Sequence, residues 1–245
     1  DLIQKACDIT EKGFRRVLNY IKPNIWEYDI EAEFIHEFIK NKSKGFAYQP
    51  IIASGINACS LHYNTNNSIC KSGDLILMDV AAEYSNYKSD MTRTIPVDGK
   101  FTKRQLEIYN AVLNVKNKAT NILRPGITIN EYHKEVGKIM ESELIEIKLL
   151  DKHDVKKQNP KNPLFKKYFM HGTSHHLGLD VHDVGNFYVD LSPGNVFTVE
   201  PGIYIREENL GVRLEDNILV GEDKNYNLMK NIPILPEEIE DIMNN

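Results

Sequence analysis

The stretch FMHGTSHHLGLDVHD, residues 169–183, decides how the rest of the chain is interpreted. It contains four histidines within twelve residues, among glycines and few good helix formers. They are His171, His175, His176 and His182. One histidine in such a place is by default structural, but this many, followed by TVEPG at residues 198–202, indicate a functional site. What they could serve depends on whether carboxylates from elsewhere in the chain join them.

The composition is that of an ordinary globular protein, with 245 residues, 41% of them hydrophobic and 27% charged. The net charge of −5 leaves no basic footprint, so we expect neither nucleic acid nor an anionic membrane as a partner. No apolar run approaches the roughly 20 residues that span a bilayer, and no leader is recognisable. Three cysteines without CxxC spacing disfavour a disulfide framework, which predicts a cytoplasmic location.

Two helices and a strand-like segment are predicted at the start of the chain. Apolar residues at helical spacing predict a helix over residues 2–21, ended by Pro23, and a second helix from about Asp29. Residues 48–63 are strand-like, and His62 near their end has no local partner. The residues alone favour a structural role for His62.

An apolar run at residues 74–82 predicts a buried strand with Asp79 near its end. A β-rich return at residues 88–95 contains Asp90, and a hairpin would bring the two aspartates together. Two unpaired carboxylates on adjacent strands repel each other and are costly to bury unless a cation lies between them. The alternative is one aspartate in a turn and the other at the surface.

Two capping boxes, at residues 102–105 and 128–131, predict two further helices, the second reaching about Leu144. His133 in that second helix is predicted to be structural. Residues 151–167 are polar and rich in lysine, which predicts a surface connection.

A second set of strands follows the histidine stretch. The apolar run 195–200 ends at Glu200, and residues 211–220, which contain Glu215, are predicted to form the returning strand. Pro236 begins a short C-terminal helix.

The two halves of the chain therefore resemble each other. Each is predicted to contain two helices followed by a strand pair with two carboxylates, Asp79 and Asp90 in the first half, Glu200 and Glu215 in the second. A duplicated helix–helix–hairpin unit packs its antiparallel sheets together with the helices outside, which is an α/β fold. Such a pseudo-twofold arrangement would bring both carboxylate pairs to one central site.

Four carboxylates and one imidazole at a common site fit a pair of hard divalent ions. Oxygen-rich ligation with one nitrogen suits Mn²⁺, Co²⁺, Fe²⁺ or Zn²⁺. Two metals about 3.5–4 Å apart can share a hydroxide, polarise a carbonyl and stabilise a tetrahedral intermediate. Amide hydrolysis is the reaction class that this set of residues suits.

Several segments resemble the aminopeptidase P and prolidase branch of the pita-bread metallopeptidases, peptidase family M24, and the resemblance covers nearly the whole chain. The segments are LMDVAAEY (77–84), SDMTRT (89–94), MHGTSHHLGLDVHDVG (170–185), TVEPGIYI (198–205) and GVRLEDN (211–217). The resemblance implies the pita-bread α/β fold and two divalent metal ions, most often Mn²⁺. It also implies hydrolysis of the Xaa-Pro bond of peptides with proline at the second position.

The resemblance assigns a set of metal ligands by matching positions. These ligands are Asp79, Asp90, His175, Glu200 and Glu215. It implies that Asp90 and Glu215 bridge the two ions and that Glu200 also serves as the general base for the shared hydroxide.

The resemblance also assigns substrate-binding and supporting residues. His62, His171 and His182 would bind the substrate and stabilise the charge that develops at the scissile carbonyl. Arg213 and Tyr204 would support the ligands and relay protons.

Three alternatives remain. Prolidase, which cleaves only Xaa-Pro dipeptides, has similar motifs, whereas methionine aminopeptidase fits the DVHDVG segment (180–185) less well. A metal-free binding module with this fold would have lost ligands, but all five positions are acidic or histidine here.

Members of this branch usually carry an N-terminal domain that contributes to oligomerisation. None is recognisable here, so we expect residues 1–245 to be the catalytic domain of a longer, homo-oligomeric protein.

Overall fold

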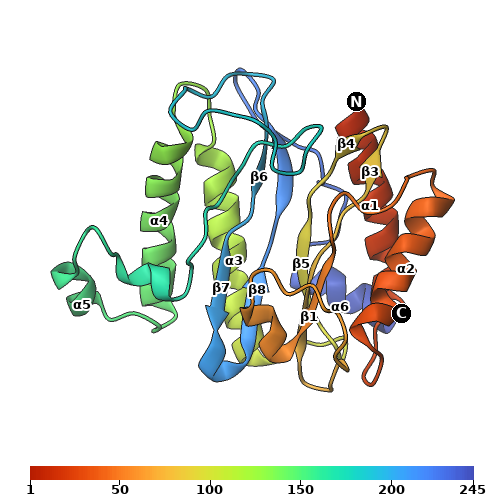
Figure 1. Ribbon diagram of the computed structural model, residues 1–245. Helices are drawn as coiled ribbons and strands as arrows, with labels where there is room; N and C mark the ends of the chain where they lie inside the picture. The colour runs from red at the N-terminus through yellow and green to blue at the C-terminus, as the bar shows by residue number, and fades with distance from the viewer.

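The computed structural model describes residues 1–245, and its two halves share a common series of two helices, a strand, a two-stranded hairpin and a returning strand (Figure 1). The first half contains α1 (Leu2–Leu18), α2 (Glu27–Lys40), β1 (Ile51–Ser54), β2 (Leu75–Asp79), β3 (Glu83–Tyr84), β4 (Tyr87–Lys88) and β5 (Thr92–Pro96). The second contains α3 (Lys103–Ile122), α4 (Ile129–Glu146), α5 (Lys152–Lys157), β6 (Val196–Val199), β7 (Gly202–Ile205), β8 (Leu210–Arg213), β9 (Asp216–Leu219), β10 (Tyr226–Asn227) and α6 (Pro236–Asn244).

The helices form as the sequence predicts, because their ends are chemically marked. At the start of α3, the Thr102 hydroxyl accepts from Gln105 N at 3.3 Å, and the Gln105 side chain accepts from Thr102 N at 2.8 Å. The second capping box, at Thr128, opens α4 in the same way. Helix α2 begins two residues earlier than predicted, at Glu27.

The strands form two antiparallel three-stranded sheets, in the orders β1-β2-β5 and β10-β9-β6. The hairpin β3-β4 lies between β2 and β5 in the chain, and the hairpin β7-β8 lies between β6 and β9. In both halves, therefore, an outer strand pair stops where an inner hairpin begins. The outer pairs end in register at Asp79 opposite Thr92 and at Val199 opposite Asp216.

This break in each strand pair corrects two predictions. Asp90, predicted to lie within a strand, lies between β4 and β5. Residues 211–220, predicted as one returning strand, are divided between β8 and β9, with Glu215 at the division. The division occurs because β8 pairs with β7 while β9 pairs with β6, so the chain changes partner at this point.

The segment 48–63 also differs from its prediction. Only β1 is extended, and a short 3₁₀ helix, Gly55–Cys59, follows it directly. Gly55 has φ +54°, a left-handed conformation that ends the strand. The rest of the segment is a loop that carries His62.

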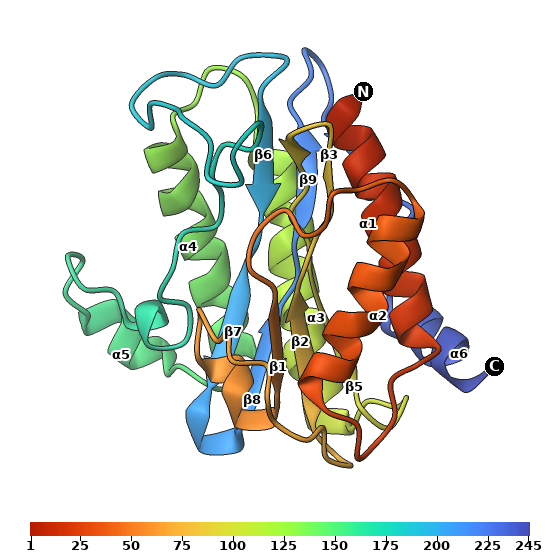
Figure 2. The ribbon, with the colours of Figure 1, turned by 45° about the vertical axis from the view of Figure 1, so that its right-hand side comes forward.

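The strands lie in the middle of the molecule, with α1 and α2 on one side, α4 on the other, and α3 behind the strands in both views (Figures 1 and 2). A continuous core of 51 buried apolar residues extends through both halves. It includes Phe34 of α2, Ile76 of β2, Val112 of α3 and Phe197 of β6. None of the helices combines the length and the apolar character that crossing a membrane requires. The core fixes the two sheets against each other, and with them the four breaks that carry carboxylates.

Candidate metal centre

A cavity of about 650 Å³ brings together nine of the ten predicted site residues. These nine are His62, Asp79, Asp90, His171, His175, His182, Glu200, Arg213 and Glu215. The tenth, Tyr204, is buried behind His171, and its hydroxyl lies 2.8 Å from His171 Nε2. The sequence repeat therefore predicted correctly that both carboxylate pairs meet.

The four carboxylates reach the cavity because each lies at a strand break. Asp79 is the last residue of β2, and Asp90 precedes β5. Glu200 directly follows β6, and Glu215 directly precedes β9. At such breaks the backbone leaves the ladder, so all four side chains can be directed to one point between the sheets.

The histidine stretch reaches the same point by running beside β6. Leu177 N donates to Val196 O at 3.1 Å, and Glu200 N donates to Thr173 O at 2.9 Å. Between these contacts, His175 and Thr198 exchange two hydrogen bonds. The glycine-rich stretch thus forms an irregular extra edge to the second sheet, which carries His175 to the carboxylates.

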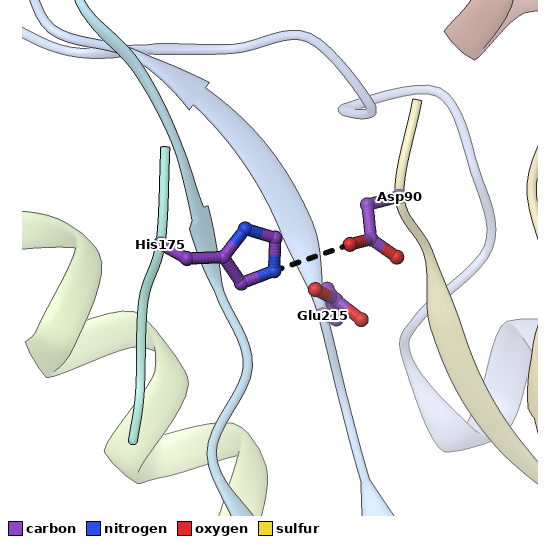
Figure 3. A group of neighbouring side chains, drawn as sticks. All are labelled: Asp90, His175 and Glu215. Carbon is purple, nitrogen blue, oxygen red and sulfur yellow. Dashed lines mark ion pairs between the residues drawn. The ribbon is translucent and has the colours of Figure 1, made fainter. Parts of the chain in front are cut away.

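Asp90, His175 and Glu215 each offer one ligand atom, and these atoms lie within 4.8 Å of one another (Figure 3). His175 Nε2 lies 3.3 Å from Asp90 Oδ2. His175 Nδ1 lies 2.9 Å from His176 O, and because a carbonyl only accepts, Nδ1 carries the proton in the neutral ring. The lone pair of Nε2 is then directed at the carboxylates, as a metal ligand requires.

Glu200 and Asp79 lie around this group rather than within it. Glu200 Oε1 is 3.6 Å from His175 Nε2, and Glu200 Oε2 is 3.7 Å from His171 Nδ1. Asp79 Oδ1 accepts from the Tyr48 hydroxyl at 2.6 Å, and Asp79 Oδ2 accepts from Arg213 at 2.7 Å. Both oxygens of Asp79 are therefore oriented before any ion binds.

The electrostatics of the cavity favour added positive charge. Burial, then Asp90, Glu200 and Asp79, raise the pKa of Glu215 well above its usual range. Burial raises the pKa of Glu200 to about 7, although His175 opposes the rise. For His175, burial lowers the pKa but Asp90 and Glu200 outweigh it, with a net rise to about 9. A divalent cation would relieve this repulsion, so the donor set fits metal ions with oxygen-rich ligation.

Three groups behind the carboxylates form one hydrogen-bonded chain. Arg213 Nη1 donates to the Tyr204 hydroxyl at 2.8 Å, so that hydroxyl donates its own proton to His171 Nε2. His171 Nδ1 then donates to Gly172 O at 2.7 Å. Burial, reinforced by Arg213, lowers the pKa of His171 to about 3. His171 is consequently neutral, with its ring orientation set from both sides.

The other two predicted histidines contact the cavity differently. The ring of His182 meets that of His175 edge to face, with centroids 4.4 Å apart. The side chain of His62 is exposed at the cavity and comes from the loop after β1.

The sequence predictions missed several residues at the cavity. His133, predicted to be structural, lines it, with Nε2 3.2 Å from Ser174 O. Thr92 donates to Glu215 Oε2 at 2.7 Å, and Asn217 holds the backbone of Asp90 by two hydrogen bonds. The signal for Thr92 was the hairpin register, which places it opposite Asp79. For His133, helical spacing gave no signal of a role at the site. The face of α4 that carries His133 becomes a wall of the cavity only when the helix packs in the folded protein.

The chain belongs to metallopeptidase family M24, whose family model matches residues 1–222. The Xaa-Pro aminopeptidase of Escherichia coli is 41% identical over 256 residues, which cover 99% of this chain and 57% of the relative. The Xaa-Pro aminopeptidase of Haemophilus influenzae is 40% identical over 255 residues, 99% of this chain and 59% of that one.

A solved structure supports the same assignment. Zinc-substituted aminopeptidase P from E. coli, in complex with product, matches with a TM-score of 0.91 at 40% identity, over 99% of this chain and 57% of that chain. The pita-bread fold predicted from sequence is thereby confirmed. The chain spans less than two thirds of the length of these relatives.

Proposed function

We propose that residues 1–245 are a catalytic domain that hydrolyses the bond between the N-terminal residue of a peptide and a proline at the second position. The observation that carries this proposal is the cavity in which four carboxylates and His175 converge between two sheets. The 41% identity to an Xaa-Pro aminopeptidase supports the choice of substrate. The relatives named above are aminopeptidases, which favours this activity over that of a prolidase.

Two divalent ions, with Mn²⁺ first and Co²⁺, Zn²⁺ or Fe²⁺ as alternatives, would be held by Asp79, Asp90, His175, Glu200 and Glu215. Ions of this kind supply Lewis acidity towards a carbonyl and a hydroxide at neutral pH. The buried, mutually repelling carboxylates support this set, since burial raises the pKa values of Glu200 and Glu215 and the neighbouring carboxylates add to the rise. Asp90, His175 and Glu215 would supply the most closely spaced part of this set, because their ligand atoms lie within 4.8 Å of one another.

The remaining residues have roles that follow from their places. Glu200 would accept the proton of the attacking water, because its carboxylate is at the cavity with no Lys or Arg bonded to it. His62, His171 and His182 would contact the peptide and stabilise negative charge at the scissile carbonyl. Arg213 and Tyr204 would fix Asp79 and His171 and move protons along their hydrogen-bonded chain.

The proposal also covers the cellular location and the assembly of the protein. All three cysteines are free and buried, which supports a reducing, cytoplasmic environment. That these residues belong to a longer, homo-oligomeric protein stays a prediction; the chain spans 57% of the length of the E. coli relative.

The test is hydrolysis of three substrates by the chelator-stripped, Mn²⁺-reconstituted protein. They are an Xaa-Pro-Yaa tripeptide, an Xaa-Pro dipeptide and a Met-Ala peptide. We expect cleavage of the tripeptide, falling by about 10²–10⁴ in Glu200→Gln, as for loss of a general base. Cleavage of the dipeptide alone would mean prolidase, and cleavage of the Met-Ala peptide alone a methionine aminopeptidase. A protein that binds no metal and cleaves nothing would be the metal-free binding module instead.

A further inference from the structure

Glu27 is a buried carboxylate that the proposed function does not use. It is the first residue of α2, its exposed fraction is 0%, and it does not line the cavity. Burying an ionised carboxylate is unfavourable unless hydrogen-bond donors replace the water it loses. The identity of those donors therefore shows what the residue does in the fold.

All five donors to Glu27 are neutral groups of Ser54, the last residue of β1, and of the segment between β1 and β2. Oε1 accepts from Ser54 N at 2.7 Å, Ser54 Oγ at 2.8 Å and Asn57 Nδ2 at 3.1 Å. Oε2 accepts from the Tyr63 hydroxyl at 2.7 Å and from Ser68 N at 2.9 Å. Hydrogen bonds to a carboxylate are about twice as strong as neutral ones. One carboxylate thus ties the start, the middle and the end of this segment to the N-terminus of α2.

The backbone strengthens the same junction. Glu27 N donates to Ser68 O at 2.9 Å, and Trp26 forms a β-bridge with Ile69. The segment is consequently closed into a loop whose two ends meet at one residue.

His62 is carried by this loop. Its side chain is exposed at the cavity, whereas Leu61 and Tyr63 on either side pack against the small core cluster that includes Ile51 and Tyr204. An exposed ring on a loop takes its position from the residues that flank it. Of these, Tyr63 is bonded directly to Glu27.

The geometry points to Glu27 as a positioning residue that holds His62 at the substrate cavity through Tyr63 and the loop ends. The inference rests on the proposed function in one respect, because the contact of His62 with a peptide gives the anchor its effect on turnover. Glu27 itself contacts no reacting atom. It acts by reducing the number of positions that His62 can occupy.

Two variants test the anchor. Glu27→Gln keeps the shape of the side chain but replaces one acceptor oxygen by an amide NH₂ group, which is itself a donor and cannot accept from the donors around it. Tyr63→Phe deletes a single hydroxyl. We expect faster amide hydrogen exchange over residues 55–68 in both, with unchanged Mn²⁺ content. For an Xaa-Pro-Yaa tripeptide we expect kcat/KM to fall by about 10- to 100-fold in Glu27→Gln, as misplacement of a contact does. Adding His62→Ala to Glu27→Gln should cause no loss beyond that of His62→Ala alone.

Matched controls separate the anchor from general destabilisation. Asp29→Asn alters the other carboxylate of the first turn of α2, which accepts from Trp26 N at 2.8 Å and makes no side-chain bond to the loop. Tyr109→Phe deletes a buried hydroxyl that donates to Ile234 O at 2.7 Å and makes no hydrogen bond to the loop. Both controls should keep the exchange rates over residues 55–68 and kcat/KM of the parent protein.

The outcomes are distinguishable. Unchanged amide exchange over residues 55–68 in both anchor variants overturns the inference. It is also overturned if the double variant Glu27→Gln with His62→Ala loses kcat/KM by the product of the two single losses. If the parent protein cleaves no peptide, the proposed function fails, and the exchange rates still decide whether Glu27 fixes the loop. If Glu27→Gln does not fold, Tyr63→Phe gives the answer, because it removes one oxygen from a half-buried ring.

Discussion

Arg213 Nη2 donates to Asp79 Oδ2 at 2.7 Å and thereby joins the two halves of the molecule at the cavity. Asp79 ends β2 in the first half, and Arg213 ends β8 in the second. The same guanidinium donates from Nη1 to the Tyr204 hydroxyl and from Nε to Thr92 Oγ1 at 3.1 Å. All three of its nitrogens are used, so the planar fork of arginine, rather than positive charge alone, is what the position requires.

Arg213→Lys should therefore weaken metal binding although the charge is kept. A lysine has a single ammonium nitrogen in place of the three nitrogens of the guanidinium, so Asp79 or Tyr204 loses its partner. We expect Mn²⁺ affinity to fall by about 10- to 100-fold, the usual effect of removing support from a metal ligand. Competition with a fluorescent chelator measures this. Arg206→Lys, at an exposed position, is the control and should bind as the parent does. Equal affinities in the two variants would show that charge alone suffices.

Tyr204→Phe should release His171 from its single tautomer. The Tyr204 hydroxyl donates to His171 Nε2, which stabilises the neutral ring with the proton on Nδ1. Without that donor we expect the tautomer with the proton on Nε2 to become populated as well, while the pKa of His171 stays low because burial and Arg213 still lower it. The imidazole ¹⁵N shifts of His171 report both the tautomer and the pKa. Tyr109→Phe should leave them untouched, and a ring that stays in one tautomer in Tyr204→Phe would refute the assignment.

Metal ions should stabilise the protein more at high pH than at low pH. In the metal-free fold, burial and neighbouring carboxylates raise the pKa of Glu215, and burial raises that of Glu200 to about 7. The folded state then binds more protons than the unfolded state, whose glutamates titrate near about 4.3, so stability falls as pH rises through the folded pKa. Ions take the place of those protons.

The measurement is the rise in Tm on adding Mn²⁺ at about pH 5 and at about pH 8, and we expect the larger rise at the higher pH. A double variant, Glu200→Gln with Glu215→Gln, should lose most of this difference, because the two carboxyl groups with raised pKa values are gone. A rise in Tm that is equal at both pH values in the parent protein would contradict the explanation.

Two lysines of α3 should differ in their contribution to stability. Lys116 is buried and pairs with Asp216, which also accepts from Arg93 at 2.7 Å. Lys118 is half-exposed and pairs with Glu143 at 2.8 Å. Lys116→Met should reduce the free energy of unfolding by about 3 kcal/mol, because it breaks a buried ion pair and leaves Arg93 as the one cation paired with Asp216. Lys118→Met should cost no more than about 1 kcal/mol.

The difference in the free energy of unfolding between Lys116→Met and Lys118→Met should depend on pH, in a direction set by Asp216. Burial raises the pKa of Asp216, but Lys116 and Arg93 outweigh it and hold the pKa well below its usual range. A depressed carboxyl pKa gives stability that is present above about pH 4 and is lost as the pH falls. Urea unfolding of the metal-loaded proteins should show the gap between the two variants narrowing in acid. A gap that widens in acid would mean that Asp216 is not the group responsible.

The sequence by itself determined the helices, the duplication and the identity of the groups at the site. Capping boxes and helical spacing act within a few residues, so the starts of α3 and α4 were predicted correctly. Each carboxylate lay beside an apolar run, and the repeat placed the two pairs together. The ligand roles stay a prediction.

Tertiary structure alone decided how these groups are arranged. Asp90 and Glu215 lie at breaks between strands because each chain segment changes partner there, and strand pairing depends on residues distant in the sequence. The same holds for His133, which packing turned into a cavity wall, and for Glu27, whose donors lie 27 to 41 residues away. Local propensity reflects neighbours in the chain, whereas a buried polar group is fixed by whichever partners the folded core brings to it.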